Sequence, residues 1–493
     1  MPPRFKELYK PHPSERDARS RRLTRESQLR RQHREQLFMG TRLRLRTPQE
    51  SETESEYEFT PTDTQRLVSA LKSTQAEQRV EALRGLSAKL EQPSEELRRF
   101  VVSGDCVGLL TGILGRAEDG EETLQSLRCM TNIAAFDGVS GEEVRMAVPY
   151  LVGLLGSSGG EVRNQAAWAL GNMAAEGEQA REHLFAGGAL PLLVEMLGEQ
   201  DAELMQTACF ALSNMARRPS SFFDLLFDQH VPQTLARQLG RFQGDQASVA
   251  ELAWVCAYLA AASSAEQLDA LLACGAVDLI LRYTAENTDC GPQVLLPAIR
   301  TLGNIAAGTD SQTHALVARP GFVPLLVRCI ESPASRAVEK ESLWALSSVT
   351  AGTKDDVDAV VAAGIVPDLV RIVESQTFDL KKEAAYSLLN IAIVGRRLDE
   401  MPVDRLVAEF VDFVRSQDDE LVRMGVQFVV LLFDQVPGNG GVEVLRRKAP
   451  EGIEALENLM AVTDDDDTRA TVSALIDRYY GEEEEEEEQG EKA

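Results

Sequence analysis

Residues 164–177 read NQAAWALGNMAAEG, and this stretch decides the fold. Its small and aliphatic residues recur at helical spacing, which predicts a helix with one buried face. The residues predicted to form that face, at i, i+3 and i+6, are Ala167, Leu170 and Met173. Trp168 and Asn172 lie four residues apart, so they share a different face of the helix, one turn from each other.

The same pattern recurs along the chain. The marker residues that correspond to the asparagine of WALGN are Asn132, Asn172, Asn214, Tyr258, Asn304, Ser348 and Asn390. Successive markers are 40, 42, 44, 46, 44 and 42 residues apart. A sustained period of this length, with two or three helices per unit, is typical of an armadillo or HEAT-type solenoid.

A second recurring segment supports this reading. It is represented by GALPLLVEML (188–197), GFVPLLVRCI (321–330) and GIVPDLVRIV (364–373). The proline suits the first turn of a helix, where its missing N–H leaves no hydrogen bond unmade. We therefore predict an all-α, right-handed superhelical solenoid of about ten repeats over residues 61–480.

Composition agrees with packed helices. The chain has 493 residues, too many for one hydrophobic core, and is 44% hydrophobic but only 6% aromatic. No apolar run reaches the roughly 18 residues that a membrane span needs, so we expect a soluble intracellular protein. The seven cysteines are scattered, never form CxxC, and pair with none of the five histidines at zinc-ligand spacing. We expect reduced thiols, no metal and no cofactor.

Charge divides the chain into further segments. Up to Arg46 there are 14 Lys and Arg against 5 Asp and Glu, although the whole chain carries a net charge of −27. We predict a basic arm over residues 1–48, disordered on its own, and an acidic linker over 49–60. Residues 481–493, with seven consecutive glutamates, are predicted to be an acidic disordered tail.

The recurring tryptophan and asparagine predict a peptide-binding groove. An asparagine amide can pair with both the N–H and the C=O of an extended peptide. Neighbouring indoles form slots for the alkyl stems of Lys or Arg, with a cation–π gain of roughly 0.5–2 kcal/mol. A lone tryptophan is more often a packing residue, and a lone asparagine before a glycine is more often a helix cap. Recurrence of both in register favours binding.

These residues resemble the importin-α family, whose members bind nuclear localisation signals. NQAAWALGNMAAEG looks like the family's second-repeat motif, and RKAPEGIEALENL with TVSALIDRYYGEEEEEEE is similar to its last repeat and acidic tail. The segment RSRRLTRESQLRRQHREQLFMGTRLRLR resembles the N-terminal importin-β-binding arm.

The resemblance implies two signal-binding sites. The residues implied for the major site are Asn132, Trp168, Asn172, Glu176, Phe210, Asn214, Glu251, Trp254 and Tyr258. Those implied for the minor site are Arg300, Asn304, Asp310, Thr313, Trp344, Ser348, Glu383, Tyr386 and Asn390. Those implied for importin-β binding, and for folding back into the groove, are Arg19, Arg21, Arg22, Arg25, Arg30, Arg31, Arg34, Arg42, Arg44 and Arg46.

The chain departs from the family pattern at several positions. Arg128 stands where the family has a tryptophan, and a cation there is expected to repel a basic ligand. Phe210 and Tyr386 replace tryptophan, which weakens cation–π contact but keeps the slots. Ser348 replaces an asparagine, and Phe136 replaces a small residue. These changes predict altered signal affinity.

The implied partners are importin-β, cargo proteins with Lys/Arg-rich signals and, at the C-terminal repeats, an export receptor. The resemblance also implies shuttling between cytoplasm and nucleus. Membranes and specific nucleic acids are not expected, although the arm could contact RNA non-specifically. One alternative is an armadillo scaffold, or an importin-α-like paralogue with weakened signal binding. An enzyme is the other alternative, but no nucleophile–His pair, phosphate loop or metal cluster is evident.

Overall fold

The computed structural model describes residues 60–490 except 92–93, 104, 117–119, 136–143, 218–221, 376–377 and 438–439. The predicted arm, the predicted linker up to residue 59, and Phe136 lie outside the described residues. The described part is helical and divides into two compact units, which meet in sequence between Tyr283 and Thr284. In that described part, no helix combines the length and apolar character that a membrane crossing requires.

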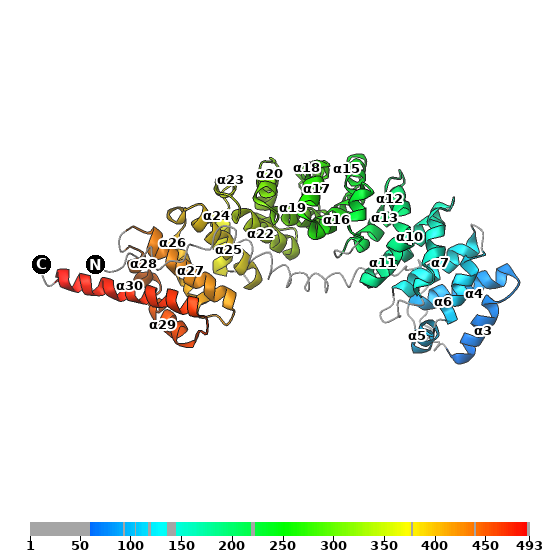
Figure 1. The fold of residues 1–493 in the computed structure, drawn as a ribbon, viewed down its shortest axis with the longest axis horizontal. Coiled ribbons are helices and arrows are strands. Elements are labelled where there is room, and N and C mark those ends of the chain that lie inside the picture. Colours follow the sequence, from blue (N-terminus) through cyan, green and yellow to red (C-terminus); the bar gives the residue numbers. More distant parts are fainter. Residues whose placement is uncertain are drawn as a thin grey trace. The chain divides into compact units, whose positions relative to one another are not determined.

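The N-terminal unit contains five long helices that stack in sequence order: α4 (Ala76–Glu91), α7 (Glu121–Ala134), α10 (Gly160–Glu176), α13 (Ala202–Met215) and α16 (Gln246–Ala262). Each packs against the next, as Figure 1 shows for α7, α10 and α13. The shorter helices before, between and after them are α3 (Pro61–Leu71), α5 (Glu95–Val102), α6 (Asp105–Leu114), α9 (Val148–Leu155), α11 (Glu178–Ala186), α12 (Ala189–Leu197), α14 (Asp224–Asp228), α15 (Val231–Arg241), α17 (Ala265–Ala273) and α18 (Ala276–Glu286), whose last residues belong to the C-terminal unit.

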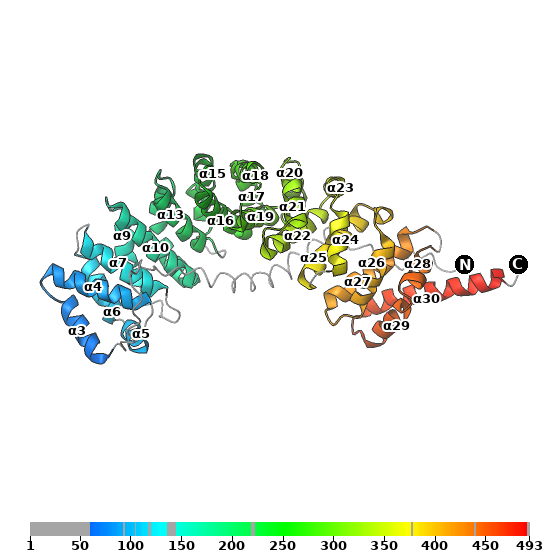
Figure 2. The same ribbon diagram turned by 180° about the vertical axis from the view of Figure 1, so that it is seen from behind.

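The C-terminal unit repeats this arrangement. Its long helices are α19 (Pro292–Ala306), α22 (Arg336–Thr350), α25 (Phe378–Val394), α27 (Asp419–Gln435) and α30 (Asp466–Gly490), again packed in order (Figure 2). The shorter elements are α20 (Asp310–Val317), α21 (Phe322–Glu331), α23 (Lys354–Ala362), α24 (Val366–Ser375), η4 (Leu398–Glu400), α26 (Val403–Val414), α28 (Gly440–Lys448) and α29 (Gly452–Val462). The repeated helical units confirm the predicted armadillo-type solenoid.

Several helices begin with the residue types that favour a helix start. Pro191, Pro324 and Pro367 lie in the first turns of α12, α21 and α24. Gly188 and Gly364, which precede two of these helices, have φ of 79° and 82°, a left-handed conformation that favours glycine. Short helices α20 and α23 each begin with a capping box, in which a threonine and a residue three positions later satisfy each other's backbone N–H.

The stripe predicted to face the core is buried. Ala167 and Leu170 have no exposed surface, and Met173 is 1% exposed. The tail, in contrast, differs from the prediction, because helix α30 continues to Gly490. Glutamate is a good helix former, and a helix already nucleated by packed residues extends with little further cost, so the helix includes residues 481–490.

Candidate functional site

Three successive long helices of the N-terminal unit carry the predicted major-site pairs. We call each pair a rung: an aromatic residue and the marker residue four positions later. The rungs are Trp168 and Asn172 on α10, Phe210 and Asn214 on α13, and Trp254 and Tyr258 on α16. The three aromatic residues are partly exposed, and the Trp254 and Tyr258 ring centroids lie 5.9 Å apart. The structure therefore repeats an aromatic surface on helices that pack in order.

Glycines on the preceding long helix allow two aromatic rings to lie close to its backbone. A Cβ atom added at Gly171 would lie 2.6 Å from Cε1 of Phe210, on the next long helix. A Cβ added at Gly303 would lie 2.6 Å from Cζ3 of Trp344. Each ring thus lies on a bare helix backbone. The sequence pattern alone did not point to these glycines as contact sites, although a Gly-Asn pair recurs inside the helices, where glycine costs about 1 kcal/mol.

The asparagine amides join neighbouring repeats. Their Nδ2 atoms donate to backbone carbonyls of the preceding long helix: Asn132 to Ser87 at 3.4 Å, Asn172 to Thr131 at 3.0 Å and Asn390 to Ser347 at 3.2 Å. One of the two Nδ2 hydrogens at these three positions therefore already has an acceptor within the protein, and Asn132 and Asn172 have no exposed surface. Contact of these amides with a peptide stays a prediction. Asn214 differs, since its buried Nδ2 has no acceptor among the described residues.

Arg128, at the aromatic position of α7, forms an ion pair. Its Nη2 lies 3.1 Å from Oε1 of Glu161 in the first turn of α10. The expected repulsion of a basic ligand is therefore reduced, because a carboxylate balances the guanidinium charge. Glu176, the predicted partner of a ligand lysine, is exposed at the last position of α10.

Two further groups shape the rung on α16. Burial raises the pKa of the partly exposed Glu251 carboxyl group to about 7. Its position three residues before Trp254 places it on the face that carries the rung. The Arg217 guanidinium carbon lies 6.0 Å from the centre of the Tyr258 ring, so this ring already has a cation of the protein near it.

The predicted minor-site residues lie in the C-terminal unit, on α19, α20, α22 and α25. Arg300 on α19 is buried and donates from Nη2 to Oε1 of Glu341 on α22 at 3.1 Å. Trp344 and Asn304 are partly exposed. The Ser348 hydroxyl donates to the carbonyl of Trp344 at 3.1 Å, so its hydrogen is used within its own helix.

The remaining minor-site side chains make mostly internal contacts. Thr313 is buried and its hydroxyl lies within hydrogen-bonding distance of the carbonyls of Ala306 and Thr309, whereas Asp310 is exposed in the first turn of α20. Glu383 Oε2 accepts from the Ser347 hydroxyl at 3.0 Å. The Tyr386 hydroxyl donates to the Glu420 carboxylate on α27. Ligand binding by these residues stays a prediction.

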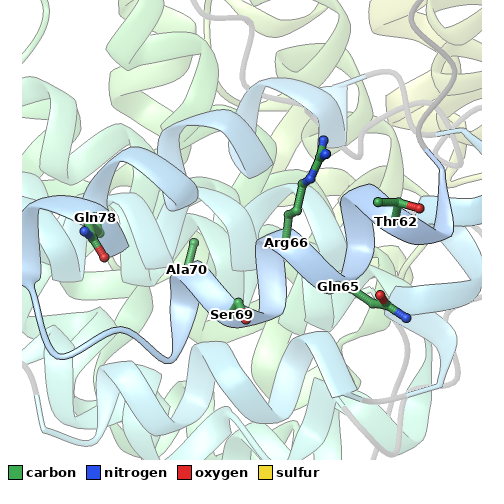
Figure 3. A pocket seen from close by; sticks show the side chains of 6 residues that line it. All are labelled: Thr62, Gln65, Arg66, Ser69, Ala70 and Gln78. Carbon is green, nitrogen blue, oxygen red and sulfur yellow. The ribbon is translucent and has the colours of Figure 1, made fainter.

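A pocket of about 480 Å³ lies elsewhere, on α3 and α4 (Figure 3). It is lined by Thr62, Gln65, Arg66, Ser69, Ala70 and Gln78. None of these side chains is buried, and none belongs to a rung. Because no buried polar group points into it, this pocket is not the candidate site.

Comparison with known proteins decides the family. Residues 142–175 match the armadillo/beta-catenin-like repeat family, and residues 160–215 match the HEAT-like repeat family. The chain is 30% identical to "Importin subunit alpha-2" of Oryza sativa subsp. japonica over 81% of this chain and 78% of that protein. The chain belongs to the importin subunit alpha family.

Two further likenesses agree with this membership. A second importin alpha relative, "Importin subunit alpha-9" of Arabidopsis thaliana, is 29% identical over 82% of this chain and 79% of that protein. Among solved structures, an engineered protein superposes with a TM-score of 0.74 at 26% identity, covering 85% of this chain and 99% of that one. At this level of identity, the chain is a divergent importin alpha with an armadillo fold.

Proposed function

We propose that this protein is a nuclear import adaptor, which holds Lys/Arg-rich localisation signals in the groove lined by its rungs. The observation that carries the proposal is the rung register on α10, α13 and α16. Three aromatic residues recur there on helices that pack in order, each four residues before a marker residue. Such a surface suits the alkyl stems and cationic heads of lysine side chains.

Charge supports the same ligand class. The chain carries a net charge of −27, so a basic peptide is attracted over long range. Each filled slot contributes about 0.5–2 kcal/mol, so two or three slots account for a selective but reversible interaction. Reversibility suits an adaptor that must release its cargo.

The arm supplies the second half of the proposal. We assign residues 1–48 to binding importin-β, and the cluster TRLRLR (41–46) to competing with cargo for the groove. Tethering gives such a cluster an effective concentration of roughly millimolar, enough to compete with micromolar signals. The proposal includes shuttling between cytoplasm and nucleus, and return by an export receptor at the C-terminal repeats.

A second candidate is a scaffold, or an importin alpha that has lost general signal binding. Specific contacts favour it: one amide hydrogen each of Asn132, Asn172 and Asn390 is used between repeats, and the Ser348 hydroxyl hydrogen is used within its helix. Arg128 also removes one aromatic slot. These contacts reduce the number of groups that can hold a peptide backbone.

A fluorescent-peptide titration distinguishes the two candidates. The full chain is titrated with a lysine-rich signal peptide and with a peptide of the same composition in scrambled order. An adaptor binds the signal peptide more tightly, whereas a lapsed paralogue binds both equally. Pull-down of importin-β by the full chain, and its loss on deletion of residues 1–48, tests the second half of the proposal.

A further inference from the structure

Three glutamates occupy equivalent positions on their long helices, three residues before the aromatic position. They are Glu251 on α16, Glu341 on α22 and Glu383 on α25. Glu341 accepts a hydrogen bond from Arg300, and Glu383 accepts one from Ser347. Glu251 has no hydrogen bond or ion pair within the described ranges. On the preceding helix, Phe210 stands at the position that Arg300 has on α19. Ser213 stands at the position that Ser347 has on α22, but its buried hydroxyl makes no hydrogen bond among the described residues.

Within the described part of the chain, no cation forms an ion pair with Glu251, and the Arg217 guanidinium lies over the Tyr258 ring instead. The titratable or charged neighbours of Glu251 on α16 and on the two helices packed against it are Glu203 and Cys209 of α13, Arg237 and Arg241 of α15, and Cys256 and Tyr258 of α16. Of these groups, all in described helices, the Cys209 thiol interacts with it electrostatically. Arg237 donates to Thr234, and Arg241 donates to backbone carbonyls after α12, so both cations are directed elsewhere.

Burial is the cause of the raised pKa of Glu251, which is about 7. At neutral pH this carboxyl group is therefore about half protonated, unlike an exposed glutamate. A ligand ammonium group beside it would supply the positive charge that Arg300 supplies to Glu341. That charge favours the ionised form of the carboxyl group.

We propose that binding of a ligand lysine beside Glu251 releases a proton from this carboxyl group to the solvent, so that the groove holds basic ligands more tightly as the pH rises from 6 to 8. The inference rests on the proposed function and adds its regulation by pH. The sign follows from linkage: the free protein binds more protons than the complex, so raising the pH favours the complex.

The size of the effect follows from the two pKa values. With a value of about 7 in the free protein and the ordinary 4.5 in the complex, affinity rises about tenfold between pH 6 and pH 8. At pH 7 the complex releases about half a proton per ligand. A lysine-rich peptide without histidine keeps its own charge constant over this range.

Isothermal titration calorimetry of the full chain with such a peptide tests the inference. Dissociation constants are measured at pH 6, 7 and 8, and the heat at pH 7 is compared in phosphate and imidazole buffers to count released protons. Glu251→Gln is expected to remove both the pH dependence and the proton release. Glu195→Gln, which neutralises an exposed glutamate on α12, is the matched control and keeps both.

The possible results distinguish a failure of the pH dependence from a failure of the proposed function. Equal affinity at pH 6 and pH 8, or a pH dependence that survives in Glu251→Gln, overturns the inference and leaves the proposed function standing. No peptide binding at any pH overturns the proposed function and the inference together.

Discussion

Replacing Gly171 with alanine tests how closely neighbouring repeats pack. The added Cβ would lie 2.6 Å from a Phe210 ring carbon and 3.1 Å from the Cα of Ala211. The ring can rotate, but the Cα belongs to the α13 backbone, so the two helices must separate. Overpacking of this kind costs about 1–3 kcal/mol, whereas Gly→Ala inside a helix gains about 1 kcal/mol. We expect a net loss of up to about 2 kcal/mol.

Urea denaturation followed by circular dichroism measures this loss. Gly85→Ala is the matched control, because Gly85 is exposed inside α4 and an added Cβ would have no neighbour within 4 Å. The control is expected to raise the urea midpoint, and Gly171→Ala to lower it. If both substitutions raise the midpoint equally, the close packing of Phe210 on Gly171 does not exist in solution.

Three further predictions concern ligand binding, measured by fluorescence anisotropy with a lysine-rich peptide. Trp254→Ala removes one cation–π slot and is expected to weaken binding roughly 2- to 30-fold. The control Phe378→Ala, at a 54% exposed position, is expected to leave binding unchanged. Equal effects of the two substitutions would show that Trp254 does not form a slot. Deletion of residues 1–48 is expected to tighten binding several-fold, and unchanged affinity would rule out competition by the arm. Arg128→Trp is expected to tighten binding roughly 2- to 30-fold, because it adds an aromatic slot. The exposed ion pair with Glu161 that it removes is worth at most about 1 kcal/mol. Weaker binding would show that this position does not face the ligand.

The sequence was sufficient to predict most of the fold. The period of the markers predicted the long helices, and the prolines at 191, 324 and 367 predicted the helix starts that the structure has. Both signals are local and periodic, so they can be read without a partner residue. The predicted C-terminal limit of the solenoid, residue 480, falls inside helix α30, which continues to Gly490 because glutamate has a high intrinsic helix propensity.

The candidate site was less predictable because its details depend on neighbouring repeats. Nothing in the local sequence says that the amide of Asn172 donates to the carbonyl of Thr131, which lies 41 residues earlier. The same holds for Arg128, whose partner Glu161 comes from the next long helix. Glu251 was predicted as a groove residue, but its lack of a partner becomes visible only beside Arg300 and Glu341. Which residues bind a signal peptide remains a prediction.

The contact between Gly171 and Phe210 also bears on how such arrays can be rebuilt. The glycine lies on one repeat and the aromatic ring that packs on it lies on the next. The unit that keeps this contact intact therefore runs from the middle of one long helix to the middle of the following one. A chimera joined at the loops would separate the glycine from its aromatic ring and place the ring against a different helix surface. Chimeric solenoids made from this chain should therefore be joined within the long helices, so that each glycine and the ring that packs on it come from the same parent.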